Sequence, residues 1–132
     1  MKKQQKLHSE WSLKTPLYIN KKDKMYKKHL NQLKKQGFSD TELWSLDVCI
    51  SKFILPRLKR FKTISGGYPA NLSEKKWQKI LDKIIFSFEW NIEENEMSEE
   101  YMKLSEKKLK RCWEKYNEGI KLFAEYFNAL WW

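Results

Sequence analysis

The chain has 132 residues and carries 27 basic and 17 acidic side chains, for a formal net charge of +10. This length suits one domain with a genuine core, and no apolar run is long enough for a signal peptide or a membrane span, so we expect neither. Four glycines and three prolines leave little material for turns, which favours a few long helices over many short strands.

Positive charge is concentrated in residues 1–36. This segment contains eleven lysines and only two acidic residues, Glu10 and Asp23, whereas residues 37–132 are close to neutral. Clustered cations gain affinity for polyanions by displacing counterions, so this segment predicts nucleic acid, a phosphate-bearing ligand or an acidic protein as a partner. The alternative is a solvated arm that only maintains solubility. We therefore expect a basic N-terminal arm and helix over residues 1–36 and a single helical domain over residues 37–132.

The first element in chain order is a basic helix. Residues 1–20 show no helical period, and Pro16 favours an irregular stretch. Residues 22–36 then predict a helix with a thin apolar stripe, and Gly37 supplies its stop. The other faces of this helix are mainly lysine.

A second helix is predicted from Ser39 to about Thr63. Ser39 and Glu42 have capping-box spacing. Pro56 predicts a kink because it lacks the amide hydrogen that the helix needs. At 100° per residue one face is mainly apolar, and we expect this face to be buried: it carries Leu43, Leu46, Ile50, Ile54, Leu58 and Phe61.

Two charged residues, Asp47 and Arg57, fall on the same face of this helix. An unpaired charge in an apolar environment costs several kcal/mol, so we expect Asp47 to be a buried charge with a partner. Asp47 and Arg57 are about 15 Å apart along the helix and cannot pair directly. Each is expected to meet another helix or a ligand.

A loop over residues 64–71 precedes a third helix that begins at Ser73. Its predicted core face carries Trp77, Ile80, Leu81, Ile84 and Phe88. Its opposite side carries a cationic and aromatic stripe of Lys79, Lys83, Phe86 and Trp90. This stripe has two alternative explanations. It can be a structural contact that the N-terminal arm or a second subunit covers, or it can be a surface that binds nucleic acid or a partner protein.

The last part of the chain predicts an acidic segment and a long helix. Residues 91–100 form either a loop or a continuation of the third helix. A final helix that begins at Met97-Ser98 can reach the C-terminus, where we expect Trp131-Trp132 to be anchored in a hydrophobic groove. The sequence therefore predicts an all-α fold, a compact bundle of about four helices with a long C-terminal helix and a lysine-rich N-terminal arm.

Catalytic side chains do not gather in any known pattern. Both histidines, His8 and His29, lie in the basic segment, so no Ser/His/Asp, Cys/His or metal constellation can be assembled. Cys49 and Cys112 lack ligand spacing, and we expect both to be buried free thiols. We therefore expect no enzymatic activity, no metal and no cofactor.

A cationic cluster lies at the end of the second helix. Cations there favour the negative end of the helix dipole, which explains them without a ligand. Guanidinium groups also grip phosphate, and a nearby tyrosine ring can stack on a base. The ligand hypothesis therefore assigns phosphate and base binding to Arg57, Arg60, Lys62 and Tyr68.

Several short motifs along residues 37–132 are similar to those of a known protein family. They are Gly37-Phe38-Ser39-Asp40, Trp44-Ser45-Leu46-Asp47, Phe53-Ile54-Leu55-Pro56-Arg57-Leu58, Gly67-Tyr68-Pro69, Leu81-Asp82-Lys83, Gly119-Ile120-Lys121-Leu122-Phe123-Ala124 and Leu130-Trp131-Trp132. In these motifs the chain resembles a family of small helical proteins of tailed bacteriophages. The resemblance implies a phage origin and a place in the host bacterial cytoplasm, and it brings no catalytic residues.

These expectations favour a non-enzymatic binding protein. In a phage setting, the leading hypothesis is a counter-defence protein that sequesters an anionic nucleotide signal or blocks a host defence complex. The second is a DNA- or RNA-binding accessory protein that uses the basic N-terminal segment. The third is a virion or assembly component, in which the aromatic stripe and the last helix make homo-oligomer contacts.

Overall fold

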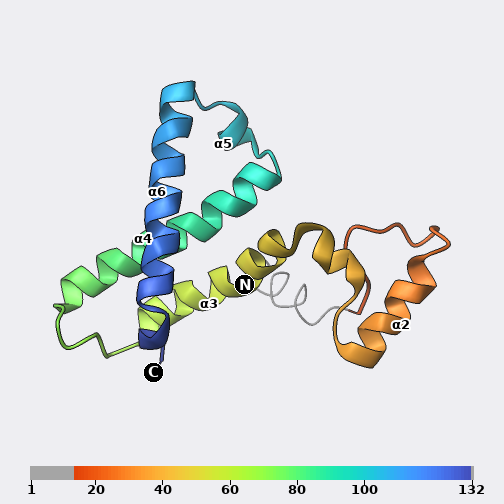
Figure 1. Ribbon diagram of the computed structural model, residues 1–132, viewed down its shortest axis with the longest axis horizontal. Coiled ribbons are helices and arrows are strands. Elements are labelled where there is room, and N and C mark those ends of the chain that lie inside the picture. The colour runs from red at the N-terminus through yellow and green to blue at the C-terminus, as the bar shows by residue number, and fades with distance from the viewer. Residues whose placement is uncertain (1–13, 132) are drawn as a thin grey trace. The chain divides into compact units, whose positions relative to one another are not determined.

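A computed structural model describes residues 14–131, and these residues form helices and turns without a strand (Figure 1). The elements are α2 (Tyr26–Gln36), the 3-10 helix η1 (Asp40–Ser45), α3 (Leu46–Ile64), α4 (Glu74–Asn95), α5 (Glu99–Met102), α6 (Glu106–Glu125) and the 3-10 helix η2 (Phe127–Ala129). The all-α prediction is confirmed. None of the helices in the described range is long and apolar enough to cross a membrane.

Contacts divide the chain into two compact units. The division falls between Phe53 and Ile54, inside α3 and just before Pro56. Pro56 cannot donate a helical hydrogen bond to the Lys52 carbonyl, so the helix is weakest in this region. The boundary predicted between residues 36 and 37 marks the change from a lysine-rich to a nearly neutral sequence. That the chain has a domain boundary there stays a prediction.

Helix α2 in the first unit is shorter than predicted at its beginning. It starts at Tyr26 because Asn20 and Asp23 form local turns instead: their side chains accept hydrogen bonds from the amides of Lys22 and Met25 at 2.9 and 2.8 Å. The predicted stop at Gly37 is confirmed. Gly37 has φ of 84°, and its amide donates to the Leu33 carbonyl at 3.0 Å.

The predicted capping box at Ser39 is present, with the Ser39 amide donating to Glu42 at 2.9 Å. It begins a 3-10 helix, however, so the helical period is three residues per turn before α3 starts. The predicted apolar face is wrong over this part: Leu43, Leu46 and Ile50 are 48 to 51% exposed. The buried face belongs instead to Val48, Cys49 and Ser51.

The core of the second unit forms between α3, α4 and α6. Its buried cluster consists of Leu55, Leu58, Ile84, Ile85 and Phe88. The predicted core face of the third helix is confirmed, because Trp77, Leu81, Ile84 and Phe88 are at most 5% exposed and Ile80 packs against the cluster. Lys59 and Lys62 of α3 also pair with Glu89 and Asp82 of α4, at 2.7 and 2.5 Å, on the surface of this helical hairpin.

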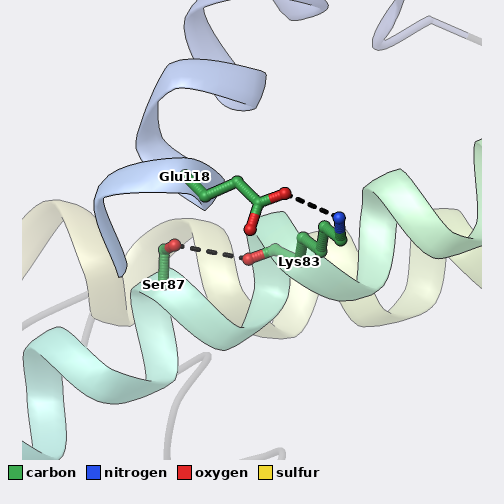
Figure 2. Close-up of polar contacts among 3 residues, drawn as sticks. All are labelled: Lys83, Ser87 and Glu118. Atoms are coloured by element: carbon green, nitrogen blue, oxygen red, sulfur yellow. Dashed lines mark hydrogen bonds and ion pairs between the residues drawn. The ribbon is translucent and has the colours of Figure 1, made fainter. Parts of the chain in front are cut away.

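Helix α6 crosses α4 at a point that has no room for a side chain (Figure 1). A methyl group at Gly119 would overlap Ser87 Oγ and the Lys83 carbonyl oxygen, and it would lie 2.9 Å from Ser87 Cβ. Ser87 Oγ donates to the Tyr116 carbonyl oxygen across the crossing at 2.8 Å. Figure 2 shows Ser87 beside the Lys83 carbonyl, and the Lys83 ammonium paired with Glu118 at 2.6 Å.

The C-terminal region is a series of shorter elements rather than one helix. The third helix continues through much of the acidic segment to Asn95, and Ser98 and Ser105 then begin α5 and α6 by accepting hydrogen bonds from the Tyr101 and Lys108 amides. Each serine hydroxyl accepts from a first-turn amide that has no carbonyl partner within its own helix, so a new helix begins there. Trp131 is 76% exposed, so its predicted anchoring is wrong, and Trp132 lies outside the described residues.

Replacing Gly119 with alanine is expected to destabilise the second unit by about 1 to 3 kcal/mol, because the backbone carbonyl of Lys83 cannot move aside. In an uncrowded helix the same change stabilises by about 1 kcal/mol. The sign of the change in the free energy of unfolding therefore shows whether the helix crossing is tightly packed. Urea denaturation followed by far-ultraviolet circular dichroism measures it.

The matched control is Gly66→Ala, because a methyl group at Gly66 meets nothing within 4 Å. We expect a change within about 0.5 kcal/mol for the control, as for other surface substitutions. Equal stability of the Gly119→Ala and control variants would show that the helix crossing is not tightly packed.

Candidate nucleic-acid interface

One face of α2 is entirely polar and strongly cationic. At 100° per residue, its side chains cluster opposite the buried side chains His29 and Leu33. We call this surface the lysine face, and it consists of Lys27, Lys28, Asn31, Lys34 and Lys35, all of which are exposed. The outer side of α2 therefore presents four ammonium groups to solvent.

The charge of the lysine face is not neutralised within the described part of the chain. The three ion pairs found there all involve lysines of α3 and α4. Asp23 is the only acid in residues 14–36, and it accepts a hydrogen bond from the Met25 amide. Lys21, Lys22 and Lys24 add three more exposed cations just before α2. This end of the first unit thus carries seven exposed lysines that form no ion pair within residues 14–131.

The buried side of α2 is fixed by a short polar network. Gln32 donates to the Asp40 carboxylate at 2.8 Å and accepts from the Asp40 amide at 3.0 Å. Its amide oxygen also lies 3.1 Å from His29 Nδ1, so His29 carries its proton on Nδ1 and donates it. His29 further contacts the Trp44 ring edge-to-face, with ring centroids 6.1 Å apart. These contacts hold α2 on η1 and set the direction of the lysine face.

Sequence reasoning assigned charge to residues 1–36 as a whole and did not single out these five positions. Their spacing of i, i+1, i+4, i+7 and i+8 is the signal that identifies them, because it is the period of one helix face. Leu33 and His29 had to be located in the core before that face could be distinguished from the others. The first 13 residues of the predicted arm, including Lys2, Lys3 and Lys6, lie outside the described residues.

The predicted phosphate and base site remains spread over the end of α3 and the following loop. Arg60 and Tyr68 are exposed and Arg57 is half-buried. Lys62 is paired with Asp82 at 2.5 Å. The site lies at the C-terminal end of α3, where the helix dipole disfavours an anion. A nucleotide site at these residues stays a prediction.

The aromatic half of the predicted stripe of α4, Phe86 and Trp90, packs against the chain's own C-terminal helices. Trp90 is 3% exposed, stacks on Phe86 at 6.5 Å between ring centroids, and meets the rings of Tyr101 and Trp113. Lys115 lies over the Phe86 ring at 5.6 Å. Lys83 is paired with Glu118, and Lys79 is exposed. The expectation that Trp90 belongs to a binding surface is therefore wrong, because α5 and α6 bury it.

Asp47 is exposed, so the predicted buried charge is wrong. The physical reason is that its helix face is turned to solvent together with Leu46 and Ile50, where water can solvate the carboxylate. Both cysteines are free: Cys49 is buried, which raises the pKa of its thiol, and Cys112 is only half-buried. Within residues 14–131, no group of three or more His, Cys, Asp or Glu side chains is placed to hold a metal ion.

Comparisons with protein-family models, with curated proteins and with solved structures find no match for this chain.

Replacing Gln32 with alanine is expected to loosen α2 from η1 and to destabilise the first unit by about 1 to 3 kcal/mol. The change removes three hydrogen bonds and leaves the buried His29 Nδ1 proton without its acceptor. Amide hydrogen exchange of α2, measured by mass spectrometry, is the most direct readout because it reports the first unit separately.

Asn31→Ala is the matched control, since Asn31 is an amide side chain one position away on the exposed face. Its exchange rates are expected to stay within about twofold of those of the parent protein, which corresponds to less than about 0.5 kcal/mol. Unchanged exchange in the Gln32→Ala variant would contradict the assigned role of this network.

Proposed function

We propose that this protein is a nucleic-acid-binding accessory protein that holds the phosphate backbone through the lysine face of α2. The observation that carries the proposal is the set of four exposed lysines on one helix face, none of which has a carboxylate partner in the described part of the chain. Binding and not catalysis is the activity that such a surface supports.

The physical driving force is the release of counterions. Lys27 and Lys35 are about 12 Å apart along the axis of α2. A duplex carries one phosphate per ~1.7 Å of its axis, so a surface of this length faces several phosphates at once. Each ammonium that neutralises a phosphate frees condensed cations, and within residues 14–131 no ion pair of these lysines has to be broken first.

The first unit supports this function by presenting α2 as a fixed helix rather than as a loose lysine tail. The Gln32 and Asp40 hydrogen bonds and the buried Leu33 hold its inner side. A fixed array loses less side-chain and backbone freedom on binding than a disordered one. The resemblance to phage proteins agrees with a role in handling phage or host nucleic acid.

A counter-defence role, through a nucleotide signal held at Arg57, Arg60, Lys62 and Tyr68, remains a separate proposal. It requires Lys62 to exchange Asp82 for a phosphate. Among the residues that the structure describes, the lysine face requires no such exchange, which is why we place it first.

The lysine face is tested by changing Lys27, Lys28, Lys34 and Lys35 together to glutamine. Binding to a duplex DNA of about 20 base pairs, measured by fluorescence anisotropy across a salt series, is expected to weaken by at least ~100-fold at low salt. The slope of log Kd against log salt is expected to fall by about 4, because each removed ammonium leaves one phosphate with its condensed cations.

Two controls separate a specific surface from net charge and from the other candidate site. Changing Lys103, Lys107, Lys108 and Lys110 to glutamine removes the same charge from exposed positions in the second unit, and it is expected to reduce the slope by less than about 1. Arg60→Ala with Tyr68→Ala is expected to leave duplex binding unchanged. If both lysine quadruples weaken binding equally, the lysine face is not the binding surface.

A further inference from the structure

The lysine face has an internal order that points to a more specific ligand. Around the axis of α2, Asn31 occupies the midline of the face. Lys27 and Lys34 lie about 40 to 60° to one side of it, and Lys28 and Lys35 lie about 40 to 60° to the other side. The face therefore has two cationic edges and one amide between them, halfway along its length.

The amide at the midline is free to make new hydrogen bonds. Asn31 is exposed, and no hydrogen bond of its side chain is found within residues 14–131. By contrast, Gln32 and Gln36, the other amide side chains of α2, are engaged with Asp40 and with the Phe38 carbonyl. Asn31 offers both a donor and an acceptor in the direction in which the lysines point.

Resting on the proposed function above, we propose that α2 enters the major groove of duplex DNA and that Asn31 contacts a base edge there. The major groove is ~12 Å wide and admits a helix, with a phosphate strand along each wall. Two lysine edges then face two walls, while the midline residue faces the groove floor. An asparagine amide pairs in two hydrogen bonds with N6 and N7 of adenine.

Other nucleic acids fit the same face less well. The major groove of duplex RNA is too deep and narrow for side chains to read. Binding of single strands relies on rings that stack on bases, and the lysine face carries no aromatic residue. The rings nearest to it in α2, Tyr26 and His29, lie on or beside the buried side. Duplex DNA is therefore the ligand that uses all five residues.

The test is selection from a pool of duplex DNA with a randomised centre, carried out with the full chain, the Asn31→Ala variant and an Asn117→Ala control. Asn117 is an exposed helical asparagine in α6, so it matches Asn31 in chemistry but not in place. We expect the parent and the control to enrich an adenine at one position. The Asn31→Ala variant is expected to lose that preference by about 5- to 100-fold.

The contact is then located by replacing that adenine with 7-deazaadenine, which removes N7 and keeps Watson–Crick pairing. This change is expected to weaken binding of the parent protein by at least about fivefold and to leave the Asn31→Ala variant unaffected.

Each other outcome overturns the inference in a distinguishable way. Steep salt dependence without base preference, or equal binding of a duplex RNA of the same sequence, would remove the major-groove assignment and leave the proposed function standing. A full chain that binds neither duplex at low salt would overturn both.

Discussion

The close approach of α6 to α4 at Gly119 is the constraint on which the second unit depends. Because position 119 has no side chain, the two helices meet with Ser87 Oγ bonded directly to the Tyr116 carbonyl. That approach brings Ile120 and Phe123 onto the core of α3 and α4 and brings Trp113 against Trp90. The buried Trp90 Nε1 has no hydrogen-bond partner among the described residues, a cost that the surrounding ring contacts must offset. One glycine thus decides whether the aromatic stripe of α4 is a surface or an interior.

The first unit follows a different principle, since its organisation depends on hydrogen bonds as much as on apolar packing. Gln32 forms hydrogen bonds with both His29 and Asp40, and the capping box at Ser39 fixes the start of η1. The large side chains Leu43 and Leu46 stay at the surface, while Ser39 and Thr41, whose hydroxyl groups contact each other, are fully buried. A polar network of this kind specifies one orientation of α2, because any rotation of the helix would leave a buried group unpaired.

The charge distribution differs between the two units. In the second unit, three lysines, Lys59, Lys62 and Lys83, each have a carboxylate partner. These exposed pairs add little stability, but they leave less uncompensated charge on the surface. In α2 the lysines have no such partners in the described chain, so their potential extends into solvent and can attract a polyanion. The sequence placed positive charge in the first 36 residues, and the fold turned a part of it into an ordered array.

The sequence by itself determined the all-α class, the caps at Ser39 and Ser73, the stop at Gly37 and the core face of α4, because these depend on residues within one or two turns of each other. It misplaced Asp47, Leu43, Leu46, Ile50 and Trp90. For the first four, the direction of the buried face follows from the 3-10 turn of η1 and from small buried side chains. For Trp90, burial depends on a helix that follows in the chain and crosses over it. Local spacing defines which residues share a face, but only tertiary packing decides which face meets solvent.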